Sequence, residues 1–158
     1  MGITKPHLRP SSGRIPRNDD KVEDNPFILL SFKLLDLHGN PKFSTDHCAD
    51  TYLAKLLNRL RDLNQTPLKE FRRPGNSLRS HIIRFAETSE KVGFASLNEQ
   101  LRDTEPWQFQ ISSNEHGRIH GILLAQTFYV VWIDPCHLLY SGEDWCSSHP
   151  RLAGPSHR

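Results

Sequence analysis

The sequence has few cysteines and no long hydrophobic run, and both absences narrow the class of protein. Its 158 residues include three cysteines, which are too few and too scattered for a disulfide framework. No apolar stretch approaches the ~18 residues that a membrane-spanning helix needs, since the longest, Ile28 to Leu37, is interrupted by polar residues. The first 25 residues are polar and offer no apolar core of a secretory signal. We therefore expect a protein of the reducing cytoplasm that does not enter a membrane.

The signature motifs of three common enzyme classes are missing as well. The chain contains no phosphate-binding loop of the Walker type, no GxGxxG fingerprint and no GxSxG elbow. An ATPase, a nicotinamide-dependent enzyme of Rossmann type and an α/β-hydrolase would each carry one of these motifs. The three cysteines also lack the sequence context of a thiol nucleophile. We therefore expect a function that needs no cofactor.

Apolar residues are scarce at both ends of the chain. Hydrophobic residues make up 36% of the sequence, and the terminal segments are dominated by Pro, Ser, Gly and charged residues. Such segments bury too little apolar surface to offset the entropy lost on ordering. We predict a disordered arm over residues 1–25, a single domain over 26–141 and a flexible tail over 142–158.

Hydrophobic periodicity predicts a strand and two helices in the first half of the domain. The strand covers Phe27 to Leu37 and stops at Gly39-Asn40-Pro41. A helix follows over 46–63, capped by Ser44, Thr45 or Asp46. Its apolar stripe is expected to pack on a sheet, with Lys55, Arg59 and Asp62 facing outward. The stripe comprises Ala49, Leu53, Leu56, Leu57, Leu60 and Leu63. A short helix restarts at Thr66-Pro67, with Thr66 as its cap.

The sequence of the second half of the domain predicts mainly strands. We predict a short strand within Ser80 to Phe85 and a short helix begun by the capping-box pair Ser96 and Glu99. Three further strands are predicted at Trp107 to Ser112, Arg118 to Leu124 and Thr127 to Asp134. The last has six consecutive apolar residues, which is typical of a central strand that is buried on both faces. The fold class that follows is α+β, a mostly antiparallel sheet with helices packed on one face.

Positive charge is concentrated between Lys55 and Arg84. Eight Lys or Arg residues lie in this segment against two acidic residues, which is the charge pattern of a phosphate-binding surface. A solvated helix face would give the same pattern. The candidate nucleic-acid-binding residues are Lys55, Arg59, Arg72, Arg73, Arg79 and His81.

Histidine is frequent, with nine in the chain, and it exchanges protons near neutral pH. Arg118 and His120 are two residues apart on one predicted strand, so both side chains share a face. His137 and Tyr140 come just after the next strand. A set of this kind could deprotonate a 2′-hydroxyl, protonate the leaving oxygen and hold the charge that develops on a phosphate. Arg118, His120, His137 and Tyr140 are therefore the candidate catalytic residues.

A zinc site is an alternative use of the late cysteines and histidines. Cys136 with His137, and Cys146 with His149, could supply two Cys and two His ligands. The pairs are not spaced as CxxC knuckles, however, and the adjacency of Cys136 and His137 makes joint tetrahedral ligation awkward. We predict no metal at these residues and keep a zinc-binding regulator as a third hypothesis.

The element order resembles that of the RelE/ParE toxin superfamily: a strand, a long helix, a short helix and then an antiparallel run of strands. The closing stretch is similar to the closing hairpin of that family, from Gly117-Arg118-Ile119-His120 through Phe128-Tyr129-Val130-Val131-Trp132 to Asp134-Pro135-Cys136-His137-Leu138-Leu139-Tyr140. The resemblance implies a metal-independent endoribonuclease toxin that cleaves mRNA at the ribosome. It further implies a small antitoxin protein as partner.

Residue by residue, the resemblance implies that Arg118 contacts phosphate, while His137 and Tyr140 match the terminal acid/base and stacking residues. The chain also departs from the family pattern, because it is longer and carries an insertion over 80–103. The alternative hypothesis is a non-catalytic interaction module. Such a module would bind protein or nucleic acid through the basic helix and the aromatic strands.

Overall fold

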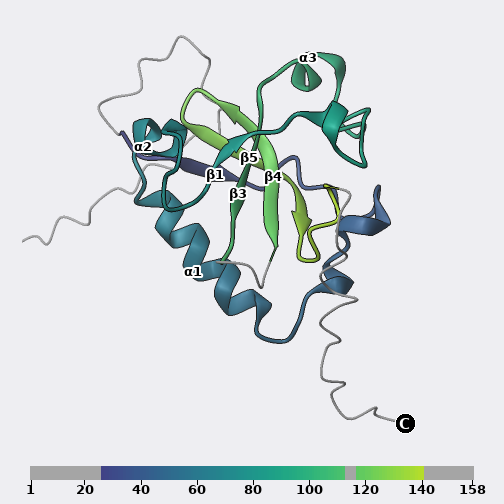
Figure 1. Ribbon diagram of the computed structural model, residues 1–158, viewed down its shortest axis with the longest axis horizontal. Coiled ribbons are helices and arrows are strands. Elements are labelled where there is room, and N and C mark those ends of the chain that lie inside the picture. The colour runs from purple at the N-terminus through teal and green to yellow at the C-terminus, as the bar shows by residue number, and fades with distance from the viewer. Residues whose placement is uncertain (1–25, 113–116, 141–158) are drawn as a thin grey trace, which may run out of the picture.

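The computed structural model describes residues 26–112 and 117–140, which form five strands and three α-helices (Figure 1). The strands are β1 (Leu29–Ser31), β2 (His81–Ile82), β3 (Pro106–Gln110), β4 (Arg118–Leu124) and β5 (Thr127–Asp134). The helices are α1 (Tyr52–Asn64), α2 (Leu68–Arg72) and α3 (Glu99–Arg102). Short 3₁₀ helices cover Pro41–Phe43, Thr45–His47 and Phe85–Glu87. The predicted arm over 1–25 and tail over 142–158 lie outside the described residues.

The five strands form one sheet in the order β1-β5-β4-β3-β2. β1 pairs with β5 in parallel, and the other three pairings are antiparallel. The predicted α+β class with a mostly antiparallel sheet is therefore confirmed. β5 lies between β1 and β4, as its continuous apolar sequence predicted, and β4 and β5 have the predicted bounds. Their hairpin turn places Ala125 in the left-handed region at φ 51°, which an L-residue adopts at some energetic cost.

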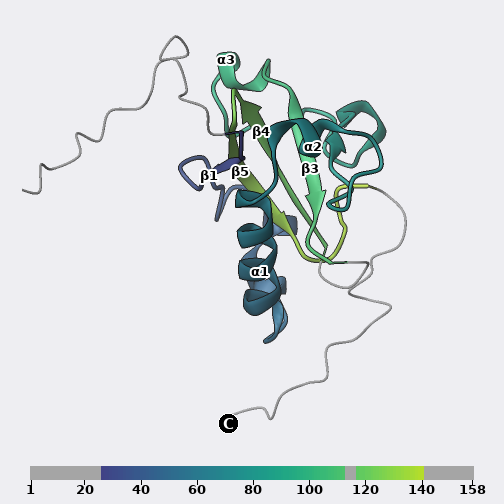
Figure 2. The same ribbon diagram turned by 90° about the vertical axis from the view of Figure 1, so that its left-hand side faces the viewer.

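α1 and α2 pack on one face of the sheet, and Figures 1 and 2 show both helices along the same side. The first hydrophobic cluster joins this face to the helices through α1 residues Tyr52, Leu56, Leu60 and Leu63. The predicted apolar stripe was wrong at three positions: Ala49 precedes the helix and is exposed, and Leu53 and Leu57 are 62% and 57% exposed. Tyr52, which the stripe omitted, is buried instead. Residues 52, 56, 60 and 63 define a narrower face than the leucine pattern suggested.

The predicted bounds of several elements need correction. The long helix begins at Tyr52 instead of 46, because Ser44 caps a separate 3₁₀ helix and accepts a hydrogen bond from the Asp46 amide. The first strand is only three residues long. Thr66 does not cap α2, since its hydroxyl donates to the carbonyl of Asp62. Asn98, not Ser96, caps α3. In each case the element exists and its boundary was misjudged.

A second hydrophobic cluster covers the opposite face of the sheet. It joins Ile122 and Trp132 of the two central strands to Phe43, Phe94 and other side chains of the loops that precede β3. The rings of Phe43 and Trp132 are stacked with centroids 4.5 Å apart. Both faces of β5 are thus buried, so the aromatic side chains Phe128 and Trp132 are inside the protein. No helix within the described residues is long and apolar enough to cross a membrane.

A β-bulge between β4 and β5 decides which side chains share a face. His120 is opposite Trp132, whereas Gly121 is opposite Val130, so β5 carries one extra residue at Val131. Val130 faces the helices, whereas Trp132, two positions further along the strand and beyond the bulge, lies on the opposite face. The bulge therefore places Asp134 on the same face as Arg118 and His120.

Candidate functional site

A cavity of about 780 Å³ lies beside β2, β3 and β4. Its walls come from the end of α2, the segment 80–87, the two strands β3 and β4, and the turn after β5. The lining residues are Arg72, Pro74, Ser80, His81, Ile82, Arg84, Glu87, Trp107, Gln108, Arg118, His120, Asp134, His137 and Tyr140. Ionisable and cationic groups dominate these walls, which makes the cavity the candidate site.

Asp134 organises the turn that follows β5. Its carboxylate accepts hydrogen bonds from the backbone amides of Leu138 at 2.8 Å and Leu139 at 3.0 Å. It also accepts a bond from Nε2 of His120 at 3.2 Å. Burial would raise the pKa of Asp134, but the bonds from His120 and the two amides, with the attraction of His120, bring that pKa below its ordinary value. Asp134 is therefore a buried carboxylate that is hydrogen-bonded both to the ring of His120 and to the backbone of the turn after β5.

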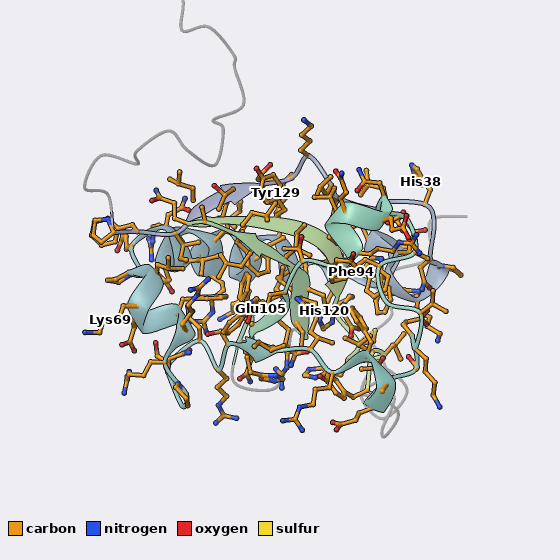
Figure 3. The ribbon with its side chains drawn as sticks, turned by 90° about the horizontal axis from the view of Figure 1, so that it is seen from above. His38, Lys69, Phe94, Glu105, His120 and Tyr129 are labelled. Carbon is orange, nitrogen blue, oxygen red and sulfur yellow. The ribbon has the colours of Figure 1, made fainter. Side chains whose placement is uncertain are left out.

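His120 is fully buried and its tautomer follows from its partner. The bond to Asp134 places a proton on Nε2, because a carboxylate can only accept. In the neutral ring Nδ1 then carries the lone pair, and this nitrogen has no hydrogen-bond partner among the described residues. Figure 3 shows His120 in the interior of the molecule, away from peripheral side chains such as Lys69 and His38. A buried polar atom without a partner is uncommon and calls for an explanation.

Arg118 is a cation beside this pair. It lies opposite Asp134 in the β4–β5 register and is half-buried. Burial and the nearby charge of Arg79 lower the pKa of Arg118, while Asp134 and Tyr140 act in the opposite direction. One guanidinium nitrogen, Nη1, is covered and lacks a partner within the described part of the chain. The guanidinium groups of Arg79 and Arg118 repel each other, and an anion bound between or beside them would relieve that repulsion.

The turn after β5 carries the two remaining catalytic candidates. His137 has φ 58° and is half-buried, and Tyr140 is half-buried just beyond the amides that Asp134 holds. Burial raises the pKa of Tyr140, against an opposing hydrogen bond from the backbone of Arg84. The Tyr140 hydroxyl therefore keeps its proton at neutral pH. Both side chains line the cavity.

His81 and Gln108 form a second polar pair in the cavity wall. Nδ1 of His81 donates to the carbonyl of Ile82 at 3.0 Å, and its Nε2 accepts from the amide nitrogen of Gln108 at 2.7 Å. Both bonds together fit the neutral ring with its proton on Nδ1. Gln108 is opposite His120 on the neighbouring strand. The two histidines are thus separated by one buried glutamine.

The structure brings all four predicted catalytic residues to one cavity: Arg118, His120, His137 and Tyr140. Of the predicted nucleic-acid-binding residues, Arg72 and His81 line it as well. Arg79 lies outside the lining, close enough to influence Arg118.

The other three predicted nucleic-acid-binding residues lie elsewhere. Lys55 is exposed on α1, and Arg73 makes a bidentate ion pair with Glu70 at 2.7 and 2.9 Å. Arg59 was predicted to face outward, but it is half-buried and its Nε donates to the carbonyl of Ile111 at 2.7 Å.

The cavity residues that were not among the sequence candidates include Arg84, Glu87, Gln108 and Asp134. The alternation Trp107-Gln108-Phe109-Gln110 was a readable signal for Gln108, because it puts both glutamines on the face opposite to the aromatic rings. Asp134 had been treated only as the end of a strand. Its role depends on the bulge at Val131, which no pattern in an all-apolar strand reveals.

The described residues contain no group of three or more His, Cys, Asp or Glu side chains placed to hold a metal ion. Two of the four residues of the zinc hypothesis, Cys146 and His149, lie outside the described ranges. Cys136 is buried and His137 lines the cavity.

Comparison with known proteins gives no further guide. No family model, curated protein or solved structure was found to match this chain. The resemblance to the RelE/ParE superfamily therefore stays a prediction, and the function must be argued from the cavity itself.

Proposed function

We propose that the protein is a metal-independent endoribonuclease that cleaves RNA in this cavity by acid–base chemistry. The observation that supports this most is the buried His120–Asp134 pair, whose second ring nitrogen has no partner within the described residues and borders a cation-lined cavity. A carboxylate that fixes one ring nitrogen of a histidine is a common way to prepare the other for proton transfer.

In the proposed reaction His120 is the general base. Nδ1 takes the proton of the 2′-hydroxyl, the 2′-oxygen bonds to phosphorus, and the bond from phosphorus to the 5′-oxygen breaks. His137 donates a proton to that leaving oxygen, so the products are a 2′,3′-cyclic phosphate and a 5′-hydroxyl. Arg118 stabilises the charge that builds on the phosphate. Because His120 is covered, RNA binding must displace side chains above it.

The charge of the cavity favours a polyanion over a neutral substrate. Arg72, Arg84 and Arg118 lie along its wall. Of its two carboxylates, Asp134 is already bonded to three N–H groups, and Glu87 lies 3.6 Å from Arg84. Among the described residues, Arg118 forms no salt bridge with an acidic side chain. A phosphodiester supplies the negative charge that such a wall lacks.

A decisive test is cleavage of a defined single-stranded RNA by the purified protein, on its own and with translating ribosomes. We expect products ending in a 2′,3′-cyclic phosphate, no cleavage of the same sequence with 2′-deoxy sugars, and no effect of EDTA. Loss of activity in EDTA that a divalent cation restores would contradict the metal-independent mechanism. Absence of cleavage under both conditions would contradict the enzymatic function.

The ribosome and an antitoxin remain the partners proposed from the resemblance. If the protein is a toxin, its induced expression should arrest growth and translation, whereas the His137→Ala protein should be harmless. We place the non-catalytic module second. The aromatic residues of β5 that it would use, such as Phe128 and Trp132, are buried, which leaves that hypothesis only the basic surface.

A further inference from the structure

The side chain of Gln108 carries a buried acceptor in the wall of the cavity. It lies on β3 opposite His120, is 3% exposed and lines the cavity wall. Its carbonyl oxygen Oε1 is covered and has no hydrogen-bond partner within the described residues. Leaving such an acceptor without a donor costs free energy. A ligand that brings a donor to this position would remove the cost.

His81 fixes the orientation of the side-chain amide of Gln108. The ring donates from Nδ1 to the carbonyl of Ile82, so only the lone pair of Nε2 is left to face Gln108. The amide nitrogen of Gln108 donates to that lone pair at 2.7 Å. Rotating the amide by half a turn would bring its oxygen against the ring lone pair, which is repulsive. Oε1 is therefore the end of the amide that is left without a partner, and a ligand reaches it by displacing the side chains that cover it, as at His120.

The proposed reaction limits the donor that a substrate could offer. The choice of donor rests on the proposed ribonuclease function. The attacking 2′-hydroxyl has one proton, and His120 takes it. A phosphodiester at neutral pH has none. Within the nucleotide that carries the attacking hydroxyl, the remaining donors are the N–H groups of the base. An imino N–H is flanked on the base edge by at least one carbonyl oxygen that would crowd Oε1, whereas an exocyclic amino group projects away from the ring.

We propose that Gln108 is a specificity-determining residue that accepts a hydrogen bond from the exocyclic amino group of a nucleobase beside the scissile phosphate. His81 is its positioning residue. Adenine, cytosine and guanine carry such a group and uracil does not. A site built around a buried hydrogen bond rejects an analogue without the matching group more strongly than an apolar pocket rejects a missing methylene.

Equilibrium binding of 2′-fluoro oligonucleotides tests this without cleavage, since they lack the attacking hydroxyl. Three matched pairs differ only in the amino group: adenosine against purine riboside, cytidine against 2-pyrimidinone riboside, and guanosine against inosine. We expect at least one amino-bearing homo-oligomer to bind about 5- to 100-fold more tightly than its partner, the range that one unpartnered buried acceptor produces. Equal binding within about twofold in all three pairs would overturn the proposal.

Variants assign the effect to its residues. Gln108→Met, which has no acceptor oxygen, should abolish the difference within the discriminating pair. His81→Phe should reduce the difference because the amide is then able to rotate. Gln110→Met is the matched control, since Gln110 lies on the same strand and face, is equally buried and does not line the cavity. Discrimination that survives in Gln108→Met would also overturn the proposal.

The results of the binding and cleavage assays show separately whether each of the two proposals fails. Cleavage of RNA together with equal binding of all pairs would reject the role of Gln108 and leave the ribonuclease intact. Discrimination that depends on Gln108 in a protein that cleaves nothing would reject the ribonuclease and retain nucleobase recognition. If the protein binds none of the oligonucleotides, the role of Gln108 is rejected, and the cleavage assays alone decide the ribonuclease.

Discussion

The carboxylate of Asp134 lies 3.2 Å from Nε2 of His120, and both side chains are completely buried. The same carboxylate holds the amides of Leu138 and Leu139, so one acidic group ties strand β4 to the turn that carries His137 and Tyr140. Any movement of His120 would therefore be transmitted to the turn through a single residue.

Replacing Asp134 with Asn should destabilise the protein by about 1–3 kcal/mol at pH 7, because three N–H donors then face a weaker acceptor or an amide N–H. The pKa of Asp134 is lowered from its ordinary 3.8, so the carboxylate's contribution is complete above that value. It is lost as the pH falls through the lowered pKa of the folded protein. Urea denaturation should show that the free energy of unfolding falls more between pH 7 and pH 3 in the wild type than in Asp134→Asn. An equal fall in the two proteins would argue that Asp134 is not a depressed, bonded carboxylate.

Gly117 should be irreplaceable for a steric reason as well as a conformational one. Its φ is +75°, and a Cβ on it would overlap the backbone carbonyl of Asp134. Gly75 has a similar φ of +71°, and a Cβ there would meet nothing within 4 Å, so it is a matched control. Gly75→Ala should cost ~1–2 kcal/mol from backbone strain alone. Denaturant melts should show a clearly larger loss for Gly117→Ala, and equal losses would mean that the close approach to Asp134 is unimportant.

The fold was largely readable from the sequence, and the reasons differ from element to element. β4 and β5 were predicted with their observed bounds because turn residues and Asp134-Pro135 delimit them. The face shared by Arg118 and His120 followed from simple alternation. The buried face of α1 was misjudged because leucine occurs on both sides of the helix, and periodicity cannot tell a leucine that meets the sheet from one at its flank, such as Leu57.

The site was readable only in part. Arg118, His120, His137 and Tyr140 were named from residue type and spacing. Asp134 was missed because its face is set by the bulge at Val131, a long-range feature of two paired strands. Arg59 was placed outside because a local pattern does not reveal a partner 52 residues away, the carbonyl of Ile111.

Two neighbouring leucines test the orientation of α1. Leu56 is 8% exposed within the main core, whereas Leu57 is 57% exposed. Leu56→Ala should lower the free energy of unfolding by about 2–5 kcal/mol. Leu57→Ala should change it by less than ~0.5 kcal/mol, as expected for a surface substitution. Chemical denaturation of both variants measures the difference, and a larger effect at Leu57 would reverse the assigned face.

Two neighbouring arginines test the route of RNA. Arg72 lines the cavity, while Arg73 is engaged by Glu70, whose hydrogen bond raises the pKa of the arginine. Arg72→Ala should weaken binding of a non-cleavable RNA and reduce the slope of log affinity against log salt by about 1. Arg73→Ala should leave the slope nearly unchanged. A larger change in slope for Arg73 would place the phosphate path outside the cavity.

The two candidate proton-transfer residues should be separable by stability. His137 is half-buried on the turn, so His137→Ala should reduce cleavage of a model RNA by about 10²–10⁴-fold, the usual range for a general acid or base, with little change in the denaturation midpoint. His120→Ala should reduce cleavage comparably and also destabilise the fold, because it leaves the buried carboxylate of Asp134 without its ring partner. His120→Ala combined with Asp134→Asn should then recover part of the stability and none of the activity. A His120→Ala protein that cleaves RNA at the wild-type rate would exclude His120 as the base, whatever its stability, and the double variant ensures that a folded protein is available for that measurement.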